Sequence, residues 1–600
     1  MKSYLPFLLL IVCFGCDLKV PIPTADLKAP FELKENYSAS YEEGMAFYDK
    51  LDGRFTKCKV IEVGETDSGK PLSLAILSKN HDFTLNELVN SDKPIFFINN
   101  AIHPGEPCGV DATMLFYRDV LANDSLRQVL DHINIVAIPY YNISGALNRN
   151  STTRANQNGP VEYGFRGNIK NLDLNRDFVK ADSKNAKTFN QVFSKLQPEV
   201  FIDNHTTNGA DYQYTMTLIN TLPEKLPASL GGLLKDNMLP FLYSDMAARG
   251  WDMTPYVSTY GSIPDQGLVA FNDLPRYSNG YAALHHSLAF TGETHMLKPF
   301  KDRVWSNYEL LHSMSTWMAN HVAELTAAHD QALEATSTEE TEVLHWQLDT
   351  TQFEDLTFKG YKAEYKPSEI TGRQRLNYNR DSSFTKTIKY YNSYRPREDQ
   401  PVAKPQAFYI PQAWTEVLER LRWNGVEVIE LDKAVEVEGQ YKYINNYETV
   451  NQPYESHYLH FNVTTRSEEA TATFEVGDFK VPLGQGRDKY IMASLAPEAP
   501  DSYFAWNFFD GILMQKEYYS PYLFEDRAVE LLDKHPDWKV ELDSLIQNDP
   551  SFTENSRTAL NWVYKKSDHY EKTHLRYPVF YGQKETIVPV NVFSEQEGEN

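Results

Sequence analysis

The stretch Pro94-Ile-Phe-Phe-Ile-Asn-Asn-Ala-Ile-His-Pro-Gly-Glu106 decides the fold of this 600-residue chain. Its apolar run after Pro94 predicts a buried strand of a parallel or mixed sheet. The run leads into a turn that carries His103 and Glu106. Open α/β sheets bind ligands beyond the carboxyl ends of their strands, and an imidazole with a carboxylate suits Zn²⁺. The stretch therefore predicts two ligands of a zinc site, and a third ligand is expected from elsewhere in the chain.

The apolar pattern predicts that this strand belongs to a larger sheet with helices packed on it. Strands alternate with segments of helical spacing, such as the one with Phe189, Val192, Phe193 and Leu196. This alternation predicts an α/β fold with a mixed, mainly parallel sheet flanked by helices. Further strands are expected at 60–63, 72–77, 133–139, 200–203 and 288–293, and helices from about 109, at 183–196 and at 302–334.

A change of composition divides the chain into two large parts. Residues 336–342 are polar and acidic, which is typical of a boundary between domains. We call residues 345–600 the accessory region. It is expected to be α+β and partly β-rich, in one or two subdomains, with a strand–helix–strand unit at 407–429. The expected organisation is a signal segment at 1–16, a tether at 17–35, a first domain at 36–335 and then the accessory region.

The N-terminus is typical of a segment for export. Lys2 is followed by a short apolar run from Leu5 to Phe14, and then by Gly15 and Cys16. A small residue directly before a cysteine resembles a bacterial lipoprotein signal, in which Cys16 would be acylated. We therefore expect an exported lipoprotein of the bacterial cell envelope, periplasmic or surface-exposed, with a lipid anchor at Cys16. Plain secretion and an uncleaved anchor are the alternatives.

Charge and cysteine content limit the partners of the chain. The formal net charge of −24 argues against binding of nucleic acid. Outside the export segment, the cysteines are Cys58 and Cys108. They are expected either to form a disulfide, since exported chains meet oxidising conditions, or to remain separate buried thiols.

Three more polar features follow His103 and Glu106 in a fixed order. The segment Asn171-Leu-Asp-Leu-Asn-Arg176 lies in a long polar loop. His205 follows the strand expected at 200–203, and Glu293 ends a later strand. The whole series resembles the zinc carboxypeptidase family, the funnelin-type metallocarboxypeptidases, over roughly residues 40–325.

A second pair with the same spacing serves as an internal comparison. His321-Val-Ala-Glu324 lies within the helix expected at 302–334 and has no strand before it. We therefore interpret this pair as part of a solvated helix face and not as a metal site.

The resemblance implies a zinc centre built from this series. His103, Glu106 and His205 would bind one zinc ion, and Asp173 would orient His103 from behind. Glu293 would act as the general base toward a zinc-activated water and would then protonate the leaving amine.

The resemblance also implies residues that bind the substrate. Arg154 would polarise the scissile carbonyl and hold its oxyanion. Asn175 and Arg176 would hold the terminal carboxylate, for which the planar guanidinium fork is suited. The substrate-capping tyrosine of the family has two candidates, Tyr277 and Tyr281, and Tyr277 is preferred because a glycine follows it at a short distance.

The implied function is zinc-dependent removal of C-terminal residues from peptides with a free terminal carboxylate. One alternative is a zinc amidohydrolase or deacylase of the aspartoacylase-like type, which shares the same ligands. The other is a catalytically silent lipoprotein that binds peptides or glycans. The intact Glu293 argues against this last alternative, because binding alone requires no base.

Overall fold

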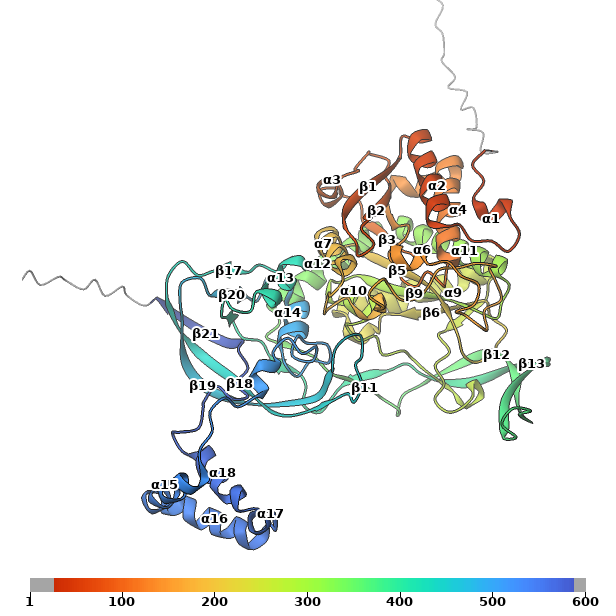
Figure 1. Ribbon diagram of the computed structural model, residues 1–600. Coiled ribbons are helices and arrows are strands. Elements are labelled where there is room, and N and C mark those ends of the chain that lie inside the picture. Colours follow the sequence, from red (N-terminus) through yellow and green to blue (C-terminus); the bar gives the residue numbers. More distant parts are fainter. Residues whose placement is uncertain (1–25, 588–600) are drawn as a thin grey trace, which may run out of the picture.

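The structure, a computed structural model, describes residues 26–587. An eight-stranded sheet with helices fills the first half of the chain, a second sheet lies in the accessory region, and a small helical lobe extends from it (Figure 1). The export segment and Cys16 lie outside the described residues. Within residues 26–587, no helix is both long enough and apolar enough to cross a membrane.

The first sheet is mixed and mainly parallel, which confirms the predicted fold class. Its strands are β1 (Cys58–Glu65), β2 (Pro71–Leu77), β3 (Ile95–Asn99), β4 (Asn134–Ile138), β5 (Val200–Thr207), β6 (Met216–Asn220), β7 (Met253–Pro255) and β9 (Leu288–His295). They are arranged in the order β1-β2-β4-β3-β5-β9-β6-β7. The inner strands β4, β3, β5 and β9 are parallel to one another, so their carboxyl ends meet at one edge of the sheet.

Helices cover both faces of this sheet. Successive side chains of a strand point to opposite faces, so a strand that is apolar throughout must be covered on both. Phe96 and Ile98 of β3 belong to one buried cluster, whereas Phe97 belongs to another. The first cluster contains residues of α2 (Tyr41–Arg54), α4 (Cys108–Ala122), α8 (Ala228–Leu233), α9 (Leu239–Ala248) and α11 (Phe300–Asn320). The second contains residues of α7 (Lys184–Leu196) and α10 (Ser278–Leu284). Short helices are α1 (Pro30–Leu33), α3 (Leu85–Val89), α5 (Asp124–Arg127) and α6 (Ile143–Leu147).

The single helix expected at 302–334 is in fact two helices, α11 and α12 (Val322–Thr338). His321 between them has φ −127° and ψ 29°. Its Nδ1 lies 2.9 Å from the carbonyl oxygen of Trp317, which the backbone N–H of residue 321 would contact in an unbroken helix. The imidazole ring also stacks on the Trp317 ring. The side chain thus replaces the backbone hydrogen bond, and α11 ends at this position.

The accessory region is β-rich with added helices, as expected. Its six-stranded sheet has the order β17-β20-β16-β21-β18-β19, with β16 (Ala407–Ile410), β17 (Ile429–Glu430), β18 (Val435–Thr449), β19 (His460–Phe474), β20 (Phe479–Pro482) and β21 (Phe580–Ile587). A long hairpin of β12 (Glu354–Pro367) and β13 (Gln374–Tyr391) pairs with β8 (Leu268–Val269) of the first domain. Short strands are β11 (Trp346–Leu348), β14 (Tyr394–Pro396) and β15 (Val402–Ala403), and β15 pairs with β10 (Thr341–Glu342) in the stretch before the region. The helices are α13 (Thr415–Trp423), α14 (Asp488–Leu495), α15 (Pro521–Lys534), α16 (Pro536–Asn548), α17 (Ser551–Glu554) and α18 (Ser556–Lys566).

The second strand of the expected unit at 407–429 is much shorter than predicted. Gly425 takes φ 69° and stops α13, and the backbone N–H of Val426 donates to the carbonyl of Leu421. This amide closes the helix end and is not available for pairing with a strand. Only Ile429 and Glu430 join the sheet, as β17.

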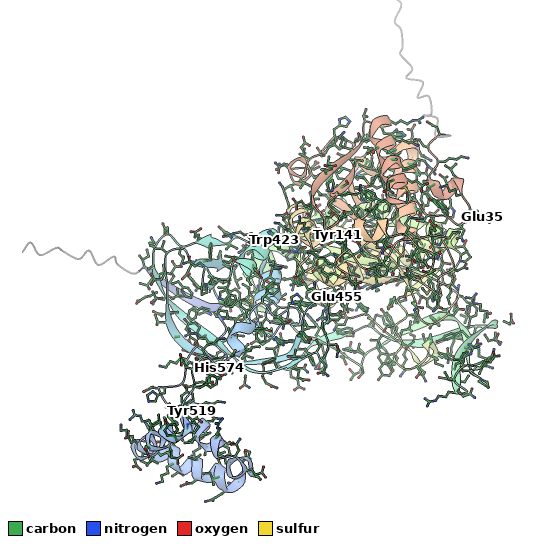
Figure 2. All side chains as sticks on the ribbon, viewed as in Figure 1. Glu35, Tyr141, Trp423, Glu455, Tyr519 and His574 are labelled. Carbon is green, nitrogen blue, oxygen red and sulfur yellow. The ribbon has the colours of Figure 1, made fainter. Side chains whose placement is uncertain are left out.

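The first domain and the accessory region share one apolar core. Phe193 on α7 and Tyr281 on α10 lie in the same buried cluster as Leu418 on α13 and Tyr490 on α14. The Ser194 hydroxyl also donates to the carbonyl of Trp423 at 2.9 Å, and Trp423 is labelled where the two regions meet in Figure 2. The two regions therefore pack against each other through buried apolar residues.

Cys58 and Cys108 are separate buried thiols and form no disulfide. Burial raises the pKa of the Cys58 thiol to about 12. Cys58 is therefore a neutral thiol at neutral pH, and the reactive thiolate is disfavoured. The structure thus agrees with the second of the two expected alternatives for this pair, separate buried thiols.

Candidate active site

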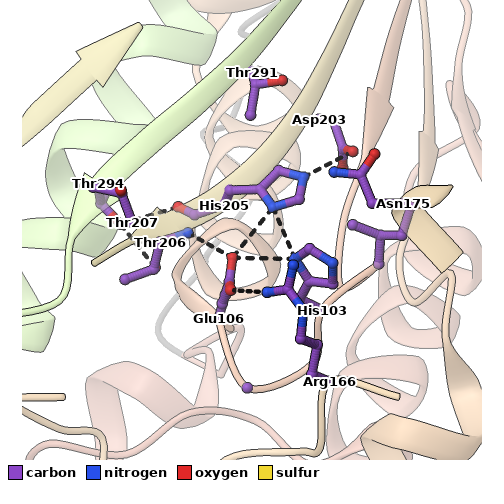
Figure 3. Close-up of polar contacts among 12 residues, drawn as sticks. His103, Glu106, Arg166, Asn175, Asp203, His205, Thr206, Thr207, Thr291 and Thr294 are labelled. Carbon is purple, nitrogen blue, oxygen red and sulfur yellow. Dashed lines mark hydrogen bonds and ion pairs between the residues drawn. The ribbon is translucent and has the colours of Figure 1, made fainter. Parts of the chain in front are cut away.

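His103, Glu106 and His205 converge at the carboxyl edge of the first sheet. The chain leaves β3 through Ala101, whose φ of 56° is left-handed, and turns so that His103 and Glu106 face the end of β5. His103 Nδ1 lies 3.1 Å from His205 Nδ1, and Glu106 Oε2 lies 3.2 Å from the latter (Figure 3). All three side chains are buried, and one ligand atom from each lies within 4.8 Å of the others. These are the three residues that the sequence predicts as metal ligands.

A carboxylate holds each imidazole from the side away from this cluster. His103 Nε2 lies 2.8 Å from Asp173 Oδ1, and His205 Nε2 lies 2.9 Å from Asp203 Oδ2. Such partners fix the ring orientation and leave Nδ1 free to bind a metal. Asp173 was predicted in this position. Asp203 was missed, although it precedes His205 by two positions on a strand, a spacing that places both side chains on one face.

Two arginines hold the outer oxygen of Glu106. Arg154 Nη1 donates to Glu106 Oε1 at 2.7 Å, and Arg166 Nη1 donates to the same oxygen at 3.2 Å. Burial would raise the pKa of Glu106, but Arg154 and His103 hold it well below its usual value. Glu106 is therefore a carboxylate whose Oε2 remains directed at the two imidazoles. Arg166, which also donates to Asp173, lies in a loop without periodic pattern, and no signal in the sequence pointed to it.

Glu293 lies beside His205 because β9 pairs with β5 in the register that sets these two residues opposite each other. Its Oε2 is buried and has no hydrogen-bond partner in the protein. Burial raises the pKa of Glu293 to about 8, with the charge of Glu106 adding to the rise and that of His205 opposing it. In its ionised form, such a poorly solvated carboxylate binds a proton readily.

The cluster opens into a cavity of about 420 Å³. Asn175 and Arg176 enter it on the short helix at Leu174–Arg176, and Tyr277 enters it from the turn before α10. Asn175 Oδ1 accepts a hydrogen bond from the Ser278 N–H, which ties the two segments together. The Arg176 guanidinium lies 4.6 Å from the centre of the Tyr277 ring. The predicted substrate-binding residues Asn175, Arg176 and Tyr277 thus share one cavity with the three predicted ligands, Arg154 and Glu293.

The structure separates the two candidate tyrosines. Tyr281 is fully buried in the shared core, and its hydroxyl donates to Asn424 Oδ1 at 2.6 Å. It does not line the cavity, so Tyr277 is retained as the candidate and Tyr281 is not. Tyr256 does line the cavity, and its hydroxyl accepts a hydrogen bond from Thr207. No periodic pattern or motif points to Tyr256, which lies in loop-rich sequence after β7.

The residues present fit a zinc ion. Two imidazole nitrogens and one carboxylate oxygen are the donor set of many catalytic zinc sites, which keep one position open. Here the three donor atoms lie close together and beside the cavity. The other polar atoms of these side chains contact carboxylates and an arginine.

Comparison with known proteins agrees with this chemistry. Residues 45–221 match the family model for zinc carboxypeptidases. This range contains the three predicted metal ligands, Arg154 and the segment 171–176, whereas Glu293 lies beyond it. Carboxypeptidase 2 of Trichophyton rubrum is 20% identical over 437 residues, which cover 69% of this chain and 74% of the relative.

Solved structures of metallocarboxypeptidases are also similar to this chain. A metallo-carboxypeptidase from Burkholderia cenocepacia has 15% sequence identity and a TM-score of 0.36, covering 47% of this chain and 70% of that one. A metallo-carboxypeptidase from Pseudomonas aeruginosa has 16% identity and a TM-score of 0.36, covering 48% of this chain and 70% of that one. The match of residues 45–221 to the zinc carboxypeptidase family model thus confirms the resemblance seen in the motifs.

Proposed function

We propose that the protein hydrolyses C-terminal peptide bonds of peptides at the bacterial cell envelope, with Glu293 as the general base. The observation that supports this most strongly is the common cavity. It holds the ligand cluster, an unpartnered Glu293 carboxylate and the Arg176 guanidinium together. Zinc bound at the cluster would supply a Lewis acid that polarises the scissile carbonyl and favours deprotonation of water.

The residues of the chain have distinct parts in this reaction. Glu293 Oε2 accepts a proton from the attacking water, whose oxygen adds to the scissile carbonyl carbon. Arg154 donates to the oxygen that gains negative charge. As the C–N bond breaks, the proton held by Glu293 passes to the leaving nitrogen. The products are a shortened peptide with a new carboxylate and a free C-terminal amino acid.

Arg176 and Asn175 would select peptides with a free terminus. The guanidinium makes two parallel hydrogen bonds with a carboxylate, and a C-terminal amide cannot accept both of them equally well. The ring of Tyr277 against Arg176 limits the directions in which the guanidinium can turn. The cavity volume of about 420 Å³ leaves room for a terminal residue and not for a folded protein segment.

The proposed function is tested with purified protein, its zinc content and two matched peptides. The wild type should contain about one zinc per chain and cleave a free-acid peptide much faster than its C-terminally amidated twin. Glu293→Gln keeps the shape of the side chain, so zinc should remain while kcat falls by about 10²–10⁴. Preferential hydrolysis of N-acyl amino acids would instead favour the deacylase alternative. Full activity of Glu293→Gln would rule out this base.

A further inference from the structure

A turn of the accessory region reaches the segment that carries the predicted carboxylate-binding residues. Between β18 and β19, Tyr454 and His457 exchange backbone hydrogen bonds of 2.7 and 3.0 Å. The two residues inside this turn, Glu455 and Ser456, have φ of 50° and 71°. This left-handed pair usually requires Asn-Gly, so Glu and Ser are held here under strain. Figure 2 labels Glu455 where the two regions meet.

The strained turn places the Glu455 carboxylate on the backbone of Asp173. The Asp173 N–H donates to Glu455 Oε2 at 2.8 Å. The Asp173 side chain in turn lies 2.8 Å from His103 Nε2 and accepts a hydrogen bond from the Asn175 N–H. A continuous series of contacts therefore leads from Glu455 through Asp173 to a ligand of the cluster.

The turn is anchored on both sides, so that this contact is held in place. His457 Nε2 lies 2.8 Å from Asp182 Oδ2, six residues after Arg176. On the other side, the Tyr454 ring lies against the guanidinium of Arg276, the residue that precedes Tyr277 in the chain. Arg276 itself is held by Asp501 of the accessory region, at 2.8 Å from its Nε and 2.9 Å from its backbone N–H. The accessory region thus contacts both segments that contribute to the cavity, the one that contains Arg176 and the one that contains Tyr277.

We propose that Glu455 is a positioning residue of the active site. By holding the Asp173 amide, it fixes the carboxylate that orients His103, so the accessory region takes part in building the metal site. The proposal rests on the proposed function in one respect only, that His103 binds zinc.

The test is the zinc affinity of the metal-free full chain, measured by competition with a chelator. Glu455→Ala removes the acceptor and should weaken zinc binding about 10-fold, the low end of the effect of losing a direct partner of a ligand, because Glu455 acts through Asp173. Glu455→Gln keeps an acceptor oxygen at the same reach and should stay within about threefold of wild type. A lower kcat/KM for free-acid peptides should follow the zinc affinity in each variant.

Ser194→Ala is the matched control, because it removes another hydrogen bond between the same two regions, from Ser194 to Trp423, far along the chain from Asp173. It should lower the melting temperature without changing zinc affinity. If Glu455→Ala behaves as this control does, Glu455 is only a contact between regions and the proposal is overturned. A glutamine variant as weak as the alanine variant would also overturn it, since the argument requires the accepted hydrogen bond. A wild type without measurable zinc binding would overturn both this proposal and the proposed function.

Discussion

Arg154 and Glu106 form an ion pair with 2.7 Å between Nη1 and Oε1. The sequence predicts these residues for different tasks, one at the oxyanion and the other at the metal. In the structure the arginine also holds the carboxylate in the direction of the imidazoles, and its Nη2 donates to the Thr206 carbonyl of β5. One guanidinium therefore supports the metal site and reaches the cavity at the same time.

Arg154→Ala should consequently have two measurable effects. Loss of the ion pair leaves Glu106 Oε1 with Arg166 alone, so zinc affinity should fall by about 10-fold or more. Loss of the oxyanion donor should lower kcat by about 10²–10³ in the zinc-saturated variant. Arg149→Ala is the control, because Arg149 lies on the same loop but donates to carbonyl oxygens of Ser38, Ala39 and Glu162. An alanine at 154 that changes kcat without changing zinc affinity would show that the ion pair does not orient the ligand.

His103→Ala should abolish zinc binding and hydrolysis together, as read by metal analysis and peptide cleavage. His321→Ala removes a histidine from the same His-x-x-Glu spacing, and it should lose only the contacts to Trp317. Zinc content and kcat of that variant should match the wild type, with at most a lower melting temperature. An essential His321 would mean that the wrong pair has been assigned to the metal.

Arg176→Lys should reduce the preference for free-acid peptides. The two charge-assisted hydrogen bonds of the arginine guanidinium are replaced by the single charge of the lysine ammonium. The value of kcat/KM for the free-acid peptide should therefore fall by about 10- to 100-fold. The amidated peptide should change little, because it makes poor use of the fork in either enzyme. The informative quantity is the ratio of acid to amide cleavage in both enzymes. An unchanged ratio would remove the main support for carboxylate recognition by Arg176.

Asp111 should make stability depend on pH. It lies on α4 and accepts hydrogen bonds from the Ser38 hydroxyl and the Ala39 N–H, yet burial raises its pKa to about 7. The folded state then holds the proton more tightly than the unfolded state. Its contribution to the free energy of unfolding is therefore present below about pH 4 and is lost as pH rises to about 7.

Asp111→Asn should remove this part of the pH dependence, which is seen as a smaller difference between urea midpoints at pH 5 and pH 8. Glu35 is exposed, so Glu35→Gln is a suitable control and should leave the difference unchanged. If Asp111→Asn retains the full difference, other groups account for it.

Cys16→Ser tests the export signal and the proposed location. The variant should lose the lipid and appear in a soluble fraction, whereas the wild type stays with membranes, as measured by fractionation and mass spectrometry of the N-terminal peptide. Cys13→Ser lies in the same segment and should not change the outcome. Membrane attachment that survives Cys16→Ser would favour an uncleaved anchor.

The residues that could be predicted are those whose positions follow from the ends of strands. β3, β5 and β9 are apolar runs in parallel register, so His205 and Glu293 had to meet beside the turn with His103. Periodicity identifies such runs because burial on both faces removes polar residues from them. The match with a known order of motifs then supplied Asp173, Arg154 and Arg176.

The residues that could not be predicted lie where chain position depends on packing between distant segments. Arg166, Tyr256 and Glu455 lie in loops or turns, and nothing in their immediate sequence specifies which segment they contact. The break at His321 was missed for another reason. Helical spacing continues on both sides of it, and the side-chain contact with the Trp317 carbonyl that accompanies the break cannot be read from that spacing.

The apolar core shared by α7, α10, α13 and α14 has a consequence for how this enzyme can change over time. The acidic stretch at 336–342 marks a change of composition, but buried rings of the two regions, such as Tyr281 and Tyr490, contact each other. A shortened chain that ends there would expose these rings to water and invite aggregation. The accessory region is therefore expected to fold together with the first domain and not as an independent module. Substitutions on one side of this core must therefore be compatible with the residues that pack on the other side.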